Sequence, residues 1–168
     1  YLTIDIEIQL IIENIINLAV KQYQPENMLV LVQEPNTGEV LAMASYPSFE
    51  PANWKAYPQE IYNRNLPIWK SYEPGSTFKI ITLSAALEEK VINVLEDHFH
   101  DGGAINVEGA RIKCWKKGGH GSQTFLQVVQ NSCNPGFVVM GQKIGKQKLY
   151  EYVEKFGMTE KTGVDLNG

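Results

Sequence analysis

The first part of the chain carries the pattern of an amphipathic helix. Apolar side chains recur at helical spacing between residues 3 and 22, behind Thr3 and Asp5, two residue types that cap helix starts. Polar residues fill the opposite side and are expected to face water. We expect the apolar side to consist of Ile8, Ile11, Ile12, Ile15, Ile16 and Ala19.

Two short β-rich apolar runs follow this helix. They cover residues 28–32 and 40–45, and turn-forming residues at 35–38 separate them. This arrangement predicts a β-hairpin. Residues 47–67 are punctuated by four prolines and several aromatic residues and are predicted to be a loop.

The rest of the chain predicts helices on either side of a glycine-rich loop. Residues 76–89 are apolar on nearly every side, as expected of a core helix, and 97–121 reads as a loop with one small hairpin. Further helices are expected at 124–130, 137–144 and 146–156. Strands followed by helices indicate an α+β fold. Because two strands seldom form a stable sheet alone, we expect further strands beyond residue 168.

Composition narrows the classes of function. The chain has 168 residues, 43% of them apolar, and a formal charge of −4, as in a soluble globular protein with one core. A nucleic-acid partner is not expected, since no excess of basic residues exists to neutralise phosphates. No apolar run approaches the roughly 20 residues that span a bilayer, and no signal peptide is recognised. The two cysteines, Cys114 and Cys133, are open to three states: buried thiols, a disulfide or metal ligands.

A Ser-x-x-Lys sequence is the first sign of chemistry. Ser76 and Lys79 stand one helical turn apart, so their side chains lie on one face, about 5–6 Å apart at Cβ. A serine hydroxyl becomes a good nucleophile when a base takes its proton. Lysine is a base only when neutral, and a helix N-terminus disfavours its cation by only about 0.3–1 kcal/mol, so burial must supply most of the pKa shift. Alone, the pattern also suits a surface lysine in a first helical turn.

A Ser-x-Asn sequence at the predicted helix break strengthens this interpretation. Ser132 and Asn134 could be capping and turn residues before Pro135. Ser-x-x-Lys followed by Ser-x-Asn is, however, the order found in penicillin-binding proteins and serine β-lactamases. Together, the two elements favour a catalytic serine more than either does alone.

The chain resembles the transpeptidase domain of class B penicillin-binding proteins, including the spore-cortex and elongation types. The likeness covers nearly all 168 residues; its most specific segments are 34–49, 63–64, 72–79, 119–121 and 132–134. It implies a partial penicillin-binding-protein or serine β-lactamase-like transpeptidase fold, with an N-terminal hairpin and a helical subdomain. Residues 1–168 would then be the N-terminal part of a single transpeptidase domain.

The resemblance also implies a role for each motif residue. Ser76 would attack the D-Ala-D-Ala carbonyl of a peptidoglycan stem peptide, or a β-lactam, to form an acyl-enzyme. Lys79 would be its base, and Ser132 would relay a proton to the leaving amine. Asn134 would hold Lys79 and the amide of the acyl side chain. The amine of another stem peptide would then resolve the acyl-enzyme and form a cross-link.

One departure concerns the third motif of the family, a Lys-Thr/Ser-Gly on an edge strand. The chain spells this tripeptide at Lys161-Thr162-Gly163, close behind Asn134 and after a helix instead of in a strand. It is followed by residues that look like a different family segment, so we reject it as the catalytic element. The true element is expected beyond Gly168, and the chain alone is expected to give little or no transpeptidation because it lacks an oxyanion donor.

A second group of residues has the chemistry of a zinc site. The group consists of one aspartate, one histidine and two cysteines. The spacings between them match no zinc finger, but all of these residue types bind Zn²⁺, and four ligands is the coordination number of structural zinc sites. The segment resembles elongation-type penicillin-binding proteins, some of which hold zinc through aspartate, histidine and cysteine at comparable places. A metal at Cys133 would brace the glycine-rich loop against the helix break that carries Ser132 and Asn134. His98 or His100 could replace the aspartate as a ligand. The candidate ligands are Asp101, Cys114, His120 and Cys133.

Three functions follow from these observations, the first being a serine D,D-transpeptidase of peptidoglycan synthesis. The others are a β-lactam sensor or serine β-lactamase of the same fold, and a zinc-braced module without catalysis. The resemblance further implies a domain outside the cytoplasmic membrane, anchored by a segment outside this chain, and partners in cell-wall synthesis.

Overall fold

The computed structural model describes residues 2–164 and 166. They form two compact units: one made mainly of residues up to Tyr72, and one spanning Glu73–Gly163. All candidate catalytic and metal-binding residues belong to the second unit.

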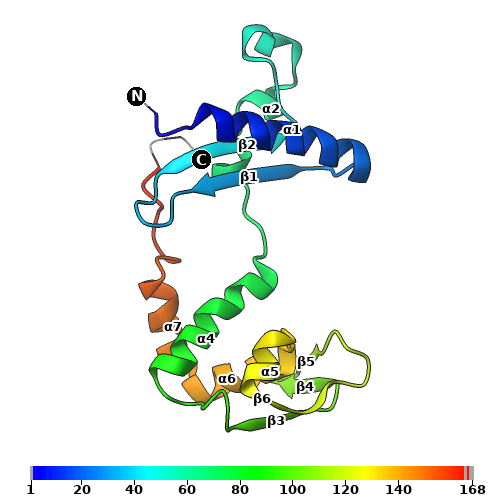
Figure 1. Ribbon diagram of the computed structural model, residues 1–168, viewed down its shortest axis with the longest axis vertical. Helices are drawn as coiled ribbons and strands as arrows, with labels where there is room; N and C mark the ends of the chain where they lie inside the picture. The colour runs from blue at the N-terminus through cyan, green and yellow to red at the C-terminus, as the bar shows by residue number, and fades with distance from the viewer. Residues whose placement is uncertain (1, 165, 167–168) are drawn as a thin grey trace. The chain divides into compact units, whose positions relative to one another are not determined.

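Helix α1 (Ile6–Tyr23) opens the first unit, as the apolar pattern predicts (Figure 1). The Asp5 carboxylate caps its start by accepting two backbone N–H groups of the first turn. Ile12 and Ile16 are buried, but Ile11 and Ile15 are 56% and 54% exposed, so the expected width of the buried face is wrong. The helix packs on β2. Because the sheet has only two strands, its apolar surface covers only a narrow stripe of the helix.

The predicted hairpin is present as β1 (Met28–Gln33) and β2 (Val40–Tyr46), paired antiparallel. The carboxamide of Gln9 in α1 binds the outer edge of β2: it accepts from Met43 N–H at 2.9 Å and donates to Met43 C=O at 3.0 Å. Three short helices occupy the region predicted as a loop: η1 (Pro51–Ala56), α2 (Gln59–Tyr62) and α3 (Leu66–Trp69).

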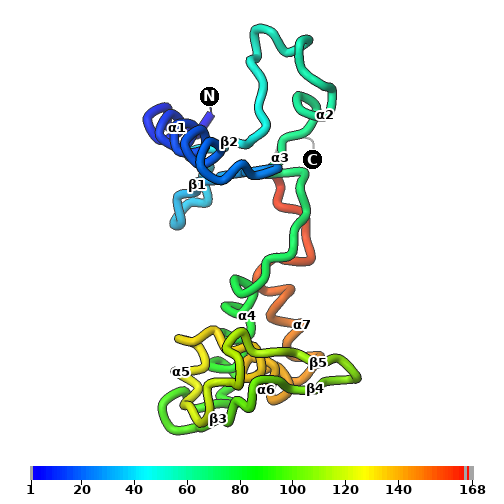
Figure 2. Tube along the Cα trace, turned by 90° about the vertical axis from the view of Figure 1, so that its right-hand side faces the viewer, coloured from blue at the N-terminus to red at the C-terminus, as the bar shows by residue number. Residues whose placement is uncertain are grey.

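The second unit is built on mutually packed helices, α4 (Lys79–Glu88), α6 (Asn134–Ile144) and α7 (Lys146–Lys155), which lie side by side in both views (Figures 1 and 2). A 3₁₀ turn, η2 (Gly75–Phe78), leads into α4. The prediction of a core helix, apolar on nearly every side, is wrong at Ile80 and Leu87, which are 63% and 45% exposed.

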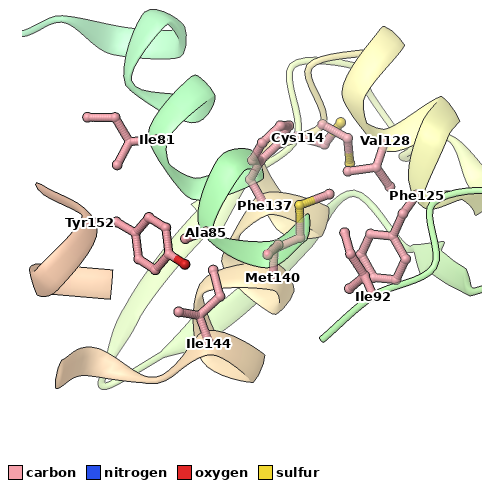
Figure 3. Packing of buried hydrophobic residues seen from close by; sticks show 12 residues of the cluster. Ile81, Ala85, Ile92, Cys114, Phe125, Val128, Phe137, Met140, Ile144 and Tyr152 are labelled. Atoms are coloured by element: carbon pink, nitrogen blue, oxygen red, sulfur yellow. The ribbon is translucent and has the colours of Figure 1, made fainter. Parts of the chain in front are cut away.

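The core of the second unit lies between α4, α6 and α5 (Phe125–Gln130) (Figure 3). Met140 and Val128 are fully buried at its centre, and Tyr152 closes it from α7. Both cysteines belong to this cluster. Its members are Ile81, Ala85, Ala86, Ile92, Cys114, Phe125, Val128, Cys133, Phe137, Met140, Ile144 and Tyr152.

The segment predicted as a loop with one hairpin contains three short strands, and a fourth begins at its last residue. β4 (Ala104–Val107) and β5 (Ala110–Lys113) form the hairpin, which projects from the helices (Figure 2). β3 (His98–Asp101) and β6 (Gly121–Thr124) form a second antiparallel ladder that was not predicted, with Asp101 opposite Gly121. This ladder brings the end of β3 to the start of β6 and so places Asp101 beside residue 120.

Candidate active site and metal centre

Ser76 and Lys79 lie at the junction between the 3₁₀ turn and helix α4. Gly75 has φ +59°, a left-handed conformation that glycine adopts at little cost, and it turns the chain into the helix. Ser76 remains exposed, whereas Lys79 is half-buried. The nucleophile candidate is therefore accessible and the base candidate is partly shielded from water.

Ser132 and Asn134 lie at the break between α5 and α6. Thr124 starts α5 with a capping box, in which its side chain and that of Gln127 each bind the other's backbone N–H. The helix stops at Gln130, and Ser132 takes a left-handed conformation with φ +47°, which is uncommon for a residue other than glycine. Asn134 is the first residue of α6.

The structure brings these four residues together. Lys79 Nζ donates to Ser132 O at 2.7 Å, to Ser132 Oγ at 2.9 Å and to Asn134 Oδ1 at 2.6 Å. Ser132 Oγ in turn donates to Ser76 Oγ at 3.1 Å. Among the described residues, Lys79 has no direct hydrogen bond to Ser76, so the polar path between them runs through the Ser132 hydroxyl.

The surroundings of Lys79 have opposing effects on its charge. Burial lowers the pKa of Lys79 from its ordinary value, while negative charge on Cys133 or Cys114 would raise it. The Phe137 ring, whose centroid lies 5.1 Å from Nζ, and the three oxygen acceptors stabilise the cation instead. A small pocket of about 150 Å³ opens beside Nζ, and it is lined by Ser76, Lys79, Ile80, Leu83, Val129, Ser132 and Phe137.

The four candidate metal ligands also converge. Asp101 Oδ2 lies 2.9 Å from His120 Nδ1 and 3.3 Å from Cys133 Sγ, and Cys114 Sγ lies 3.3 Å from His120 Nδ1. Asp101 comes from the end of β3, Cys114 follows β5, His120 precedes β6, and Cys133 lies in the helix break. The cluster therefore joins three connections: β3 to β4, β5 to β6, and the break between α5 and α6 that also carries Ser132.

Backbone groups hold the Asp101 carboxylate in place. Gly103 N–H donates to Oδ1 at 2.8 Å and His120 N–H donates to Oδ2 at 3.0 Å. Burial alone would raise the pKa of Asp101, but side-chain and backbone hydrogen bonds outweigh it and hold the pKa well below its usual range. Gly119 has φ +81°, and a Cβ there would overlap the Asp101 carbonyl oxygen, so glycine is required at this close approach.

The donor set fits a four-coordinate zinc ion. All four donor atoms lie within 4.8 Å of one another, and donors around tetrahedral zinc are about 3.3–3.8 Å apart. His120 presents Nδ1 to the other donors, while its buried Nε2 has no hydrogen-bond partner among the described residues. Burial raises the pKa of both thiols, that of Cys133 to about 11, so the cysteines are neutral unless a cation stabilises their thiolates.

The structure gives the positions of several residues for which the sequence left alternatives open. Cys114 and Cys133 are free thiols in the structure. Asp101 belongs to the ligand cluster, and neither His98 nor His100 does. Lys161, Thr162 and Gly163 are exposed and lie in no strand, in line with their rejection as the third catalytic element.

Sequence reasoning missed Trp115, which lies between the two sites. Its indole Nε1 donates to Asn131 O at 2.7 Å, and its ring meets His120 edge-on with centroids 5.2 Å apart. The available signal was its position next to Cys114, although no sequence pattern indicates that an indole reaches across to a helix break.

The fold and this constellation of serines, lysine and asparagine define a class of protein, and the family comparison agrees. Residues 28–168 match the model of the penicillin binding protein transpeptidase domain. The chain belongs to this family. The resemblance stated from the sequence, and the partial transpeptidase fold that it implied, are therefore confirmed.

Individual relatives make the likeness more specific. The chain is 53% identical to stage V sporulation protein D of Bacillus subtilis over 99% of its own length and 26% of that protein's. It is 32% identical to a peptidoglycan D,D-transpeptidase FtsI homolog of Mesostigma viride, over 94% of the chain and 27% of the relative. Among solved structures, a peptidoglycan synthetase from Bifidobacterium adolescentis matches with a TM-score of 0.86 at 26% identity, covering 99% of this chain and 30% of that one. The chain thus spans about a quarter of the length of the curated relatives it matches.

Proposed function

We propose that Ser76 is the nucleophile of a D,D-transpeptidase that cross-links peptidoglycan, and that residues 1–168 are the N-terminal part of its transpeptidase domain. The observation that carries the proposal is the continuous polar path from Ser76 Oγ through Ser132 Oγ to Lys79 Nζ. Family membership and the transpeptidase names of relatives support the same activity. The substrates are peptidoglycan stem peptides, and β-lactams are inhibitors that occupy the same site.

The geometry suggests how the first half of the reaction proceeds. Ser76 Oγ attacks the D-Ala-D-Ala carbonyl carbon, and its proton moves through the Ser132 hydroxyl toward neutral Lys79. Ser132 then delivers a proton to the leaving D-alanine nitrogen. The C–N bond breaks and the acyl group remains on Ser76 as an ester. A β-lactam acylates Ser76 by the same step.

The second half runs in reverse with a different amine. The amine of another stem peptide attacks the ester carbonyl, its proton returns along the path, and Ser76 leaves as a hydroxyl. Asn134 holds Lys79 through Oδ1, and its Nδ2 donates to Lys113 O at 3.2 Å. In this proposal the same amide also contacts the acyl side chain of the substrate.

A fluorescent penicillin tests the nucleophile in the protein expressed at its full natural length. We expect stoichiometric labelling that mass spectrometry locates on Ser76, no label in Ser76→Ala, and full label in Ser48→Ala, a serine of the first unit. Label that persists in Ser76→Ala would overturn the assignment. Label lost within seconds to minutes would indicate a serine β-lactamase, and stable label without cross-linking of stem peptides would indicate a sensor.

We also propose that the 168-residue chain alone gives little or no transpeptidation. Its Lys161-Thr162-Gly163 tripeptide is exposed and lies in no strand, whereas the family's third motif lies on an edge strand that supplies an oxyanion donor. Loss of one such donor costs about 10²–10³-fold in rate. Rapid stoichiometric labelling of Ser76 in residues 1–168 alone would contradict this part.

We propose a structural zinc ion for the cluster of Asp101, Cys114, His120 and Cys133. Support comes from the convergence of four zinc-binding side chains and from the backbone bonds that orient the carboxylate. Bound there, zinc supplies no catalytic step; it fixes the loop against the helix break. A zinc-braced module without catalysis would be favoured if partner binding survived Ser76→Ala and no penicillin label formed.

Localisation is also part of the proposal. No helix among the described residues is both long and apolar enough to cross a bilayer. The family resemblance supports a domain outside the cytoplasmic membrane that is held by an anchor outside this chain. Protease accessibility in intact protoplasts would test this placement.

A further inference from the structure

Hydrogen bonds to the two flanking peptide groups hold Ser132 in its left-handed conformation. Ser132 N–H donates to Val129 O at 3.0 Å, and Cys133 N–H donates to Val128 O at 3.0 Å. Ser132 C=O accepts from Lys79 Nζ at 2.7 Å. These three bonds come from the backbone of α5 or from the proposed catalytic lysine.

The fourth group of these two peptides is the carbonyl of Asn131, and Trp115 binds it. Trp115 Nε1 donates to Asn131 O at 2.7 Å from 16 positions earlier in the chain. The Trp115 side chain is 67% exposed, so burial of the ring does not explain why the indole is placed there. The hydrogen bond and the edge-on contact with His120 account for its position.

We propose that Trp115 is a positioning residue, whose indole N–H fixes the Asn131 carbonyl and thereby the backbone that presents Ser132 Oγ to Ser76 and Lys79. Among the four bonds, it is the only side-chain anchor that lies outside the proposed catalytic set. A non-glycine residue at positive φ persists only when its surroundings hold it there. Without the indole, water solvates the Asn131 carbonyl, and only the other three bonds hold Ser132 in the left-handed region.

The inference rests on the proposed acyl-enzyme function, and kinetics of the full-length protein test it. Trp115→Phe keeps an aromatic ring beside His120 but removes the N–H. We expect the rate constant of acylation by a fluorescent penicillin to fall about tenfold, with the dissociation constant of the non-covalent complex unchanged. Trp54→Phe, in the first unit, is the matched control and should change neither constant. The reverse pattern, weaker binding with unchanged acylation, would show that Trp115 is only a wall of the substrate cleft and would overturn the proposal.

Replacement of Trp115 by 3-benzothienylalanine separates the hydrogen bond from ring packing. This side chain has the size of tryptophan but carries sulfur in place of the N–H. It should slow acylation as much as Trp115→Phe does. Acylation at the native rate would mean that packing of the ring is sufficient, and the proposal would fail.

Amide hydrogen exchange gives a readout that does not depend on activity. In Trp115→Phe we expect the amides of Ser132 and Cys133 to lose about tenfold in protection, while amides of α7 keep theirs. Unchanged protection at Ser132 and Cys133 would overturn the inference. Absence of any penicillin label in the native protein would instead reject the proposed function and leave this measurement to decide the role of Trp115.

Discussion

Lys79 contacts Ser132 twice, with Nζ 2.7 Å from the backbone carbonyl oxygen and 2.9 Å from Oγ. The start of α4 is therefore joined to both the backbone and the side chain of Ser132, in the break before α6. One of these bonds fixes the backbone, and the other belongs to the polar path that leads to Ser76. The two contacts can be separated by mutation, because only the second needs the hydroxyl.

Ser132→Ala should preserve the fold and slow acylation. The methyl side chain keeps both backbone hydrogen bonds of the residue but removes the Oγ that connects Ser76 to Lys79. We expect the acylation rate constant to fall by about 10²-fold or more, the usual contribution of a positioned proton-transfer group. Stopped-flow measurement with a fluorescent penicillin checks this. Ser122→Ala, on the exposed side of β6, is the control, and a loss below about threefold in Ser132→Ala would argue against the path.

The pH dependence of acylation should report the ionisation of Lys79. Since burial lowers the pKa of this lysine, its neutral form becomes available at lower pH than for a free side chain with pKa 10.5. The rate should rise with pH, because the base is neutral only above its pKa, and level off before pH 10.5. Cys114 and Cys133 also act on Lys79, but their charge should change little over most of this range: without a metal their raised pKa values keep them neutral, and with zinc bound both remain thiolates. Lys79→Met should abolish the rising limb; a rate that falls with rising pH would contradict the role of base.

Metal analysis should find about one zinc per chain in protein purified without chelator. Cys133→Ser removes one donor from the cluster and should lower both the zinc content and the melting temperature. His98→Ala, whose side chain lies outside the cluster, should leave both unchanged. A native protein with no more zinc than Cys133→Ser would end the zinc hypothesis, and a mass lower than that of the dithiol by two hydrogen atoms would identify a disulfide instead.

Two glycines with similar backbone angles should respond differently to alanine. Gly119 and Gly109 have φ +81° and +85°, but a Cβ at Gly119 would overlap the Asp101 carbonyl, whereas Gly109 has open space around it. We expect Gly109→Ala to cost about 1 kcal/mol of unfolding free energy and Gly119→Ala about 3 kcal/mol or more. Urea unfolding of the two variants measures the difference. Equal costs would show that the loop relaxes around residue 119.

The sequence predicted elements wherever local signals were strong. The Asp5 cap, the turn between β1 and β2 and the helix that begins behind Thr124 all depend on residues close in sequence, and each lies where it was expected. The ladder between β3 and β6 escaped prediction because β6 reads Gly-Ser-Gln-Thr, without apolar alternation, and its partner is distant in sequence. Exposure of Ile11 and Ile15 depends on how much sheet faces the helix, which periodicity does not encode.

The residues of the candidate catalytic site could be predicted because their side-chain types and their order along the chain form recognisable motifs. Ser76, Lys79, Ser132 and Asn134 were identified from motif order, and the structure places them within hydrogen-bonding reach as a connected set. A proton relay by Ser132 was expected, but the position of its hydroxyl between Ser76 and Lys79 was not, nor was the Trp115 contact. Both depend on a left-handed residue and on the packing of segments far apart in sequence.

The pairing of Asp101 with Gly121 has a consequence for natural variation of the loop between them. Side chains alternate sides along a strand, so a one-residue slip of this four-residue ladder would turn the carboxylate away from the two thiols. Insertions within the turn of the β4–β5 hairpin leave that alignment untouched, whereas a single deletion inside β3 or β6 would break it. This loop can therefore change in length at the hairpin turn while its four donors stay together.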